Sequence, residues 1–128
     1  MPRVVHFEIH ASDPNRMVKF YTEVFGWKIT HMPQMQYWLI DTGDPDRPGI
    51  NGGLMQRKGP KPEKGQAINA HVCTVDVPSV DDYWKRALAA GASPAMPKMT
   101  IPGVGYAAYV LDPDGNIFGL YQVDKTAQ

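Results

Sequence analysis

The sequence predicts an α+β fold in which one strand, one helix and three further strands occur twice. Two amphipathic helices each follow an apolar strand and precede several short strand-like segments. Landmark residues recur in register in the two halves, and a polar linker separates them. We therefore expect one duplicated domain over residues 1–128, with repeat one at about 3–56, the linker at about 57–66 and repeat two at about 67–124.

The two helices are indicated by their capping residues and apolar stripes. The first is expected to begin after Asp13 as N-cap, with Pro14 at its first position, and to end at Gly26. The second is expected to follow Ser79, which forms a capping-box pattern with Asp82. The residues at helical spacing are Met17, Phe20, Tyr21 and Val24 in the first helix and Val80, Tyr83, Trp84, Ala87 and Leu88 in the second.

Strands account for most of the remaining chain. The 12 prolines and 12 glycines divide it into short pieces, and residues 112–116 form a strong turn sequence. Strands are expected at residues 4–9, 28–31, 37–41, 53–56, 70–77, 95–100, 106–111 and 117–123.

The two halves share four landmarks whose spacings agree to within two residues. A single coincidence would carry little weight, but four in register indicate an internal duplication. The pairs are His6 with His71, Phe20-Tyr21 with Tyr83-Trp84, Gly26 with Gly91, and Gly53 with Gly119.

Composition excludes several classes of partner. Thirteen basic residues balance thirteen acidic ones, so the net charge supplies no general attraction to nucleic acid or to an anionic membrane. The single cysteine, Cys73, has no internal disulfide partner, and no apolar run approaches the length of a membrane span. We expect a cytoplasmic protein whose partner is a small molecule, with neither nucleic acid nor membrane as a partner.

The segments HFEIHASDPNRMVKFYTEVFGW, INGGLM and IPGVGYAAYVLDPDGNIFGLYQ, together with the duplication, resemble the vicinal oxygen chelate superfamily. That superfamily includes glyoxalases, bleomycin-resistance proteins and extradiol dioxygenases, and the likeness is greatest to its small predicted lactoylglutathione lyase-related proteins. The resemblance implies curved mixed sheets around a cavity and a homodimer. It does not identify a reaction, because the fold hosts several chemistries.

The resemblance also implies a metal site that is incomplete in this chain. Its ligand positions on the first strands fall on His6 and His71, whereas the last-strand positions, usually glutamate, fall on Gly53 and Gly119. A catalytic divalent ion normally needs three protein ligands. We therefore expect no cofactor, with a weakly held Zn, Ni, Mn or Fe ion, completed by Glu8, as the alternative.

Strand alternation suggests which other residues carry chemistry. It places His6, Glu8 and His10 on one face, and His71, Cys73 and Val75 on the matching face of repeat two. Glu8 is the candidate general base for proton abstraction beside a carbonyl, and a structural hydrogen-bonding role is its alternative. Cys73 is either an activated thiolate or an inert, buried thiol.

A further set of side chains is expected to line a pocket, because ligand sites are mostly apolar with a few polar anchors. Ordinary core packing is the alternative for each of the aromatic and methionine members. The candidate substrate-binding residues are His6, His10, Tyr37, Met55, His71, Cys73, Tyr106, Tyr109 and Tyr121.

Three functions are consistent with these features. The first is a metal-independent protein that binds a small molecule, and it follows from the missing carboxylates and the many tyrosines. The second is a lyase or isomerase acting on a small carbonyl compound, with Glu8 as base and His6 and His71 as polarisers or weak metal ligands. The third is an interaction protein whose cavity is vestigial.

Overall fold

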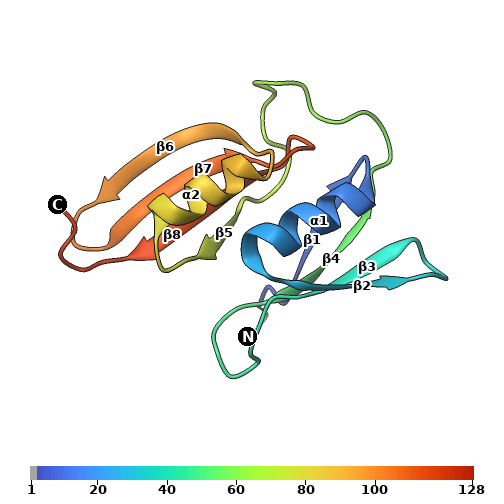
Figure 1. Ribbon diagram of the computed structural model, residues 1–128, viewed down its shortest axis with the longest axis horizontal. Helices are drawn as coiled ribbons and strands as arrows, with labels where there is room; N and C mark the ends of the chain where they lie inside the picture. Colours follow the sequence, from blue (N-terminus) through green and yellow to red (C-terminus); the bar gives the residue numbers. More distant parts are fainter. Residues whose placement is uncertain (1–2) are drawn as a thin grey trace. The chain divides into compact units, whose positions relative to one another are not determined.

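The chain folds into two units, each a four-stranded sheet with one helix packed against it (Figure 1). In this computed structural model, which describes residues 3–128, the contacts divide the chain between Lys61 and Pro62. The strand order is β1-β4-β3-β2 in the first unit and β5-β8-β7-β6 in the second. The predicted α+β fold with two βαβββ repeats is confirmed. That the two units form one domain stays a prediction.

The first unit is a mixed sheet in which β1 pairs with β4 in parallel and the other pairs are antiparallel. The parallel pair requires a crossover, and the helix supplies part of it. Its elements are β1 (His6–Ala11), α1 (Pro14–Phe25), β2 (Lys28–Met32), β3 (Tyr37–Asp41) and β4 (Asn51–Gln56).

The second unit repeats this arrangement, with β5 parallel to β8 and two antiparallel pairs beyond it. Its long outer strand carries two register shifts between Pro94 and Met99. Its elements are β5 (Cys73–Asp76), α2 (Val80–Ala89), β6 (Ser93–Ile101), β7 (Gly105–Leu111) and β8 (Ile117–Val123).

Both helices begin at the predicted caps. Asp13 Oδ1 accepts a hydrogen bond from the Arg16 amide at 3.3 Å, and Ser79 Oγ accepts one from the Asp82 amide at 3.1 Å. Each bond satisfies an amide that has no partner within the helix. The first helix ends at Gly26, whose φ of 73° is the left-handed conformation that glycine adopts without strain.

Each unit has its own apolar core between its helix and one face of its sheet. The fully buried side chains in the first unit include Met17, Val24, Ile40 and Leu54. Those in the second unit include Val80, Val110 and Leu120. Each helix packs on one face of its own sheet, and the opposite face of that sheet is left uncovered by the helix.

Strand β5 is shorter than the expected strand at 70–77, and His71 lies before it. Register explains the difference. Cys73 pairs with Phe118, so an extended β5 would place His71 opposite Asn116. Asn116 is committed to the turn before β8, where its carbonyl accepts from the Asp112 amide at 2.8 Å. The parallel ladder therefore begins at Cys73.

The helix-free faces carry the residues of interest, and strand alternation assigns their members. We call them the first open face and the second open face. The first open face includes His6, Glu8, His10, Tyr37, Leu39, Gly53 and Met55. The second open face includes Thr74, Asp76, Ala107, Tyr109, Gly119 and Tyr121.

Among the described residues, neither helix has the length and apolar character that a bilayer crossing requires.

The turn between β7 and β8 is held by one buried carboxylate. Asp112 is 2% exposed, and its Oδ1 accepts from the amides of Asp114 at 2.8 Å and Asn116 at 2.9 Å. Its Oδ2 accepts from the Asn116 side-chain amide at 2.9 Å. Gly115 completes the turn with a φ of 84°. This geometry fixes where β8, and thus Gly119, lies against β7.

We expect Asp112→Ala to lower the free energy of unfolding by about 2 to 3 kcal/mol, because it leaves buried amides without an acceptor. Urea denaturation followed by circular dichroism measures the loss. Glu63→Ala removes an exposed carboxylate from the same unit and should change stability by less than about 0.5 kcal/mol. Equal effects of the two substitutions would contradict this account of the turn.

Candidate active site

Four side chains on the first open face form a continuous polar network. His6 Nε2 lies 2.8 Å from the Tyr37 hydroxyl oxygen, and the Tyr37 hydroxyl lies 3.2 Å from Glu8 Oε2. Glu8 Oε1 lies 3.1 Å from His10 Nε2. The order along the network is therefore His6, Tyr37, Glu8, His10. The network links Glu8, the predicted base, to three residues that were predicted to bind substrate.

Strand geometry brings these residues together. His6, Glu8 and His10 alternate along β1, so their side chains project from one face. Tyr37 belongs to β3, which β4 separates from β1, and it lies opposite Met55 of β4. Its ring crosses β4 diagonally to reach Glu8, which pairs with Gly53. The network thus spans three strands of the sheet.

Proton accounting fixes the direction of each hydrogen bond. A carboxylate only accepts, so Tyr37 donates its single hydroxyl proton to Glu8 and His10 donates its Nε2 proton to the other oxygen. The Tyr37 oxygen then accepts from His6 Nε2. Both imidazoles accordingly carry a proton on Nε2, the nitrogen that faces the network.

The network changes the acidity of its two central groups. The pKa of Glu8 is lowered, chiefly by the hydrogen bond from His10, with a smaller contribution from Tyr37 and a partial opposing effect of desolvation. The pKa of Tyr37 is raised, first by desolvation and then by the hydrogen bond to Glu8 and its negative charge. Both shifts favour an ionised carboxylate beside a protonated phenol.

Gly53 is the position that makes the network possible. A Cβ at this residue would overlap the hydroxyl and the ring of Tyr37. The tyrosine therefore occupies the volume that a side chain at position 53 would need. An aromatic ring that lies across a glycine of the neighbouring strand covers the exposed backbone there.

The second unit repeats this glycine and tyrosine arrangement. Tyr109 of β7 lies directly opposite Gly119 of β8. A Cβ at residue 119 would come within 2.9 Å of the Tyr109 ring and within 2.9 Å of Thr74 Oγ1. Both last-strand glycines are thus enclosed by a tyrosine from the adjacent strand.

The register corrects the expectation that His71, Cys73 and Val75 occupy the face matching that of His6. Gly119 pairs with Thr74, whereas Gly53 pairs with Glu8. Thr74 therefore corresponds to Glu8, and Cys73 projects to the opposite side of its sheet. The sequence comparison placed the first strand of repeat two one residue out of step.

Three predicted site residues lie away from the open faces. His71 precedes β5, and Cys73 is an exposed free thiol rather than a buried one. Tyr106 projects to the helix side, where Lys98 Nζ lies 4.4 Å from its ring centroid and also binds Asp81 of α2 at 3.1 Å. Any role of these residues in binding stays a prediction.

The remaining predicted residues lie on the open faces, together with some that sequence reasoning missed. Met55 lies on the first open face, and Tyr109 and Tyr121 on the second. Leu39, opposite Gly53, is 46% exposed, and Asp76 lies opposite Tyr121. Counting every second residue along the strands that flank Gly53 and Gly119 would have identified Leu39 and Asp76 from the sequence.

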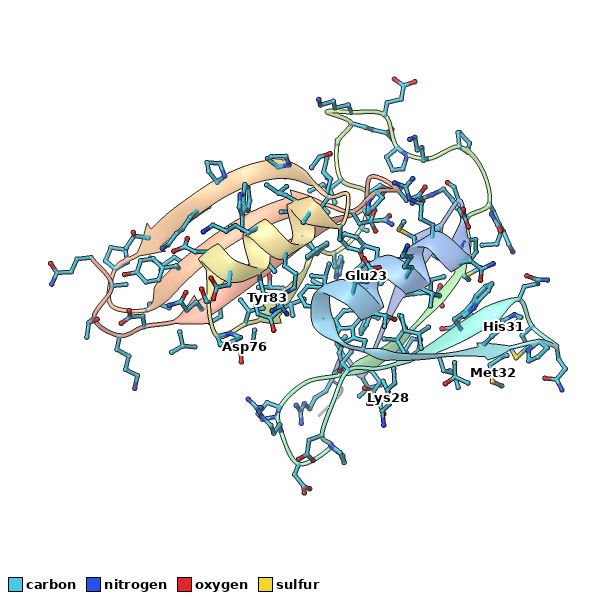
Figure 2. The ribbon with its side chains drawn as sticks, viewed as in Figure 1. Glu23, Lys28, His31, Met32, Asp76 and Tyr83 are labelled. Atoms are coloured by element: carbon cyan, nitrogen blue, oxygen red, sulfur yellow. The ribbon has the colours of Figure 1, made fainter. Side chains whose placement is uncertain are left out.

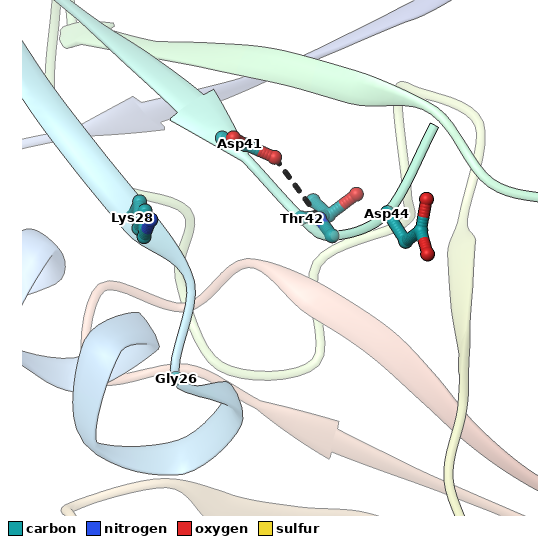
Figure 3. A pocket seen from close by; sticks show the side chains of 6 residues that line it. Gly26, Lys28, Asp41, Thr42 and Asp44 are labelled. Atoms are coloured by element: carbon teal, nitrogen blue, oxygen red, sulfur yellow. Dashed lines mark hydrogen bonds between the residues drawn. The ribbon is translucent and has the colours of Figure 1, made fainter. Parts of the chain in front are cut away.

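A separate hollow of about 330 Å³ lies at the end of β3, outside this network (Figure 3). It is lined by Gly26, Lys28, Asp41, Thr42, Gly43 and Asp44. Figure 2 shows Lys28 at the start of β2, at the opposite end of that strand from His31 and Met32. Asp41 Oδ1 accepts from the Gly43 amide at 3.1 Å, which is a local turn contact. The hollow shares no lining residue with the polar network.

Residues 3–120 match the family model described as the Glyoxalase/Bleomycin resistance protein/Dioxygenase superfamily. The chain belongs to this superfamily. The sequence resemblance is thereby confirmed at the level of the superfamily. Among curated proteins, none matches the chain.

Solved structures with the superfamily fold cover nearly the whole chain. The fosfomycin resistance protein FosX from Listeria monocytogenes has 18% identity and a TM-score of 0.71, over 97% of this chain and 95% of that one. TioX from Micromonospora sp. ML1 has 22% identity and a TM-score of 0.67, over 96% and 100%. A superfamily enzyme from Burkholderia phytofirmans PsJN has 22% identity and a TM-score of 0.68, over 93% and 97%. At these identities the likeness establishes the fold alone.

The first open face lacks the last-strand carboxylate that the sequence resemblance implies for the metal-dependent superfamily members. Residue 53 is glycine, and Tyr37 fills the space beside it. His6 Nε2 is bonded to the Tyr37 hydroxyl. Across residues 3–128, no three side chains of His, Cys, Asp or Glu are grouped so as to hold a metal ion.

We expect Gly53→Ala to displace Tyr37, because the new methyl group overlaps the ring. The hydrogen bond from Tyr37 to Glu8 is then lost, and the pKa of Glu8 rises towards its ordinary value. NMR titration of the Glu8 carboxyl carbon measures the shift. Tyr37→Phe, which removes only the hydroxyl, should raise the pKa in the same direction. A Glu8 pKa that responds to Tyr37→Phe but not to Gly53→Ala would contradict the steric coupling.

The lowered pKa of Glu8 also predicts how its contribution to stability depends on pH. Because the folded pKa lies below the unfolded one, the stabilisation is present above the ordinary carboxyl pKa and is lost as pH falls through the folded pKa. The difference in unfolding free energy between the native chain and Glu8→Gln should shrink over that acid range. Urea denaturation across a pH series tests this, and a difference that grows towards acid pH contradicts it.

Proposed function

We propose that the chain is a small-molecule-binding protein of the superfamily that recognises its ligand on the first open face, without the usual metal. One observation carries the proposal: the Tyr37 hydroxyl occupies the place of a residue-53 side chain and bonds to both His6 and Glu8. A group that would complete a metal site in other members is here replaced by a hydrogen-bonded phenol. What results is a polar recognition site.

The surroundings of the network support recognition of a small molecule. Leu39 and Met55 flank the tyrosine on the same face, and neither is fully buried. Small-molecule sites combine such apolar surface with a few fixed polar groups that orient the ligand. The network is fixed in this sense, because each of its central groups is held by two hydrogen bonds.

The second open face is proposed as a separate ligand-contacting surface of the second unit. Tyr109 and Tyr121 project from it, and Thr74 and Asp76 add polar atoms beside them. Tyrosine supplies both an apolar ring and a hydroxyl, so it suits recognition of an aromatic or drug-like compound. A homodimer and a cytoplasmic location, which the resemblance and the single cysteine favour, complete the proposal.

The relatives support a small-molecule role and mark where this chain departs from them. FosX proteins confer fosfomycin resistance, and a mutant of the Listeria protein is in complex with Mn(II) and 1S,2S-dihydroxypropylphosphonic acid. At the last-strand positions of this chain, Gly53 and Gly119 supply no carboxylate. We therefore propose a broad class of small-molecule ligands, bound without a metal.

A lyase or isomerase with Glu8 as general base is the second candidate. It is favoured by the direct contacts of Glu8 with Tyr37 and His10, which form a proton-transfer chain. The pKa of Glu8 argues against it, because a general base works best with a pKa near the operating pH, and that of Glu8 is lowered. Binding without turnover is therefore placed first.

Metal and ligand binding can be separated in one set of measurements on the native chain. After chelator treatment and back-addition of Mn, Zn, Ni or Fe, we expect no stoichiometric metal at micromolar affinity, because the ligand set does not fit. A thermal-shift screen of small molecules should give ligands whose stabilisation grows with concentration. Stoichiometric metal would overturn the metal-free proposal, and the absence of any ligand would favour a vestigial site.

The position of the binding face can be tested with two matched substitutions. Leu39→Arg places a long charged side chain at the centre of the first open face and should weaken a screened ligand by about tenfold or more. Met35→Arg makes the same change at a 67% exposed residue in the turn between β2 and β3 and should have little effect. Equal effects of the two variants would place the ligand elsewhere.

A further inference from the structure

We infer that the ligand of the first open face is a hydrogen-bond-donating cation, a primary or secondary amine that carries a small apolar group. The inference rests on the proposed function and specifies the chemical class that the site selects. Donors, acceptors, charge and apolar surface around Glu8 all favour this class.

The polar network uses its proton donors internally. His6 Nε2–H points to Tyr37, the Tyr37 hydroxyl points to Glu8, and His10 Nε2–H points to the other oxygen of Glu8. Each carboxylate oxygen has about two acceptor sites, and the network occupies one on each. Each Glu8 oxygen can therefore accept one more hydrogen bond, which a ligand supplies with an N–H or O–H donor.

The charge of the network points in the same direction. Glu8 is its one carboxylate, and its side chain is 41% exposed. The nearby Arg57 donates from Nη2 to the main-chain oxygen of His10 at 2.9 Å, which places that donor on the backbone of β1. An ammonium group approaching Glu8 gains a charge-assisted hydrogen bond, whereas a carboxylate or phosphonate meets a like charge.

The apolar part of such a ligand has a surface to occupy. The Tyr37 ring crosses Gly53 next to Glu8, and Leu39 lies opposite that glycine with 46% of its surface exposed. Met55, opposite Tyr37, extends this surface along β4. A cation beside the face of a tyrosine ring gains additional stabilisation. The site thus combines the Glu8 carboxylate with an apolar surface formed by Tyr37, Leu39 and Met55.

Three probes of the same size but different charge test the inference: benzylamine, benzyl alcohol and benzoate. Each is titrated into the native full chain at neutral pH and followed by amide NMR shifts of the first open face. We expect benzylamine to bind about tenfold more tightly than benzoate. Glu8→Gln should weaken benzylamine about tenfold while changing benzyl alcohol by less than about twofold.

A matched control removes a carboxylate elsewhere in the same unit. Glu23 lies on α1, where it is exposed (Figure 2) and 3.9 Å from Lys19, and Glu23→Gln should leave all three affinities unchanged. Circular dichroism establishes that both variants are folded, and Tyr37→Phe provides a second variant within the network.

The outcomes separate the inference from the proposed function. Tighter binding of benzoate or benzyl alcohol than of benzylamine on this face overturns the amine class and leaves small-molecule binding in place. An equal loss of benzylamine affinity in Glu8→Gln and Glu23→Gln overturns the role of Glu8. If neither these probes nor any screened compound perturbs the first open face, both the inference and the proposed function fail.

Discussion

The arrangement of the first open face depends on one steric relation, the passage of the Tyr37 side chain over Gly53. The glycine leaves room for the ring, and the ring brings a hydroxyl between His6 and Glu8. Without that hydroxyl the hydrogen bonds that link His6 to Glu8 are lost, and the network is reduced to the pair of Glu8 and His10. Because residue 53 is glycine, the four side chains of the network can hydrogen-bond in the order His6, Tyr37, Glu8, His10.

The same relation shows how an absent side chain on one strand makes room for a group from another. A glycine at residue 53 opens the space beside it to a neighbouring side chain. In this chain the space is taken by a phenol, which is a hydrogen-bonding group whose pKa is raised. The Tyr37 hydroxyl thus stands where a residue-53 side chain would lie, without any change in strand order.

Much of the fold could be predicted from the sequence because its signals are local. The caps Asp13 and Ser79, and the strands at 37–41 and 117–123, follow from residue type and spacing and agree with the structure. The start of β5 could not be predicted, because it depends on the turn that engages Asn116, a residue far along the chain. The face predicted for Cys73 was wrong because Thr74, and not Cys73, corresponds to Glu8. A shift of one residue in a strand moves every side chain to the other face. The Tyr37 contact was missed because it joins strands that are not adjacent in the sheet.

The mutual dependence of Gly53 and Tyr37 has an evolutionary consequence. Any larger side chain at residue 53 meets the tyrosine, and loss of the tyrosine alone opens a gap beside the glycine. A larger residue at position 53 therefore requires a change at Tyr37 as well, so we expect the two positions to vary together among relatives that keep this face.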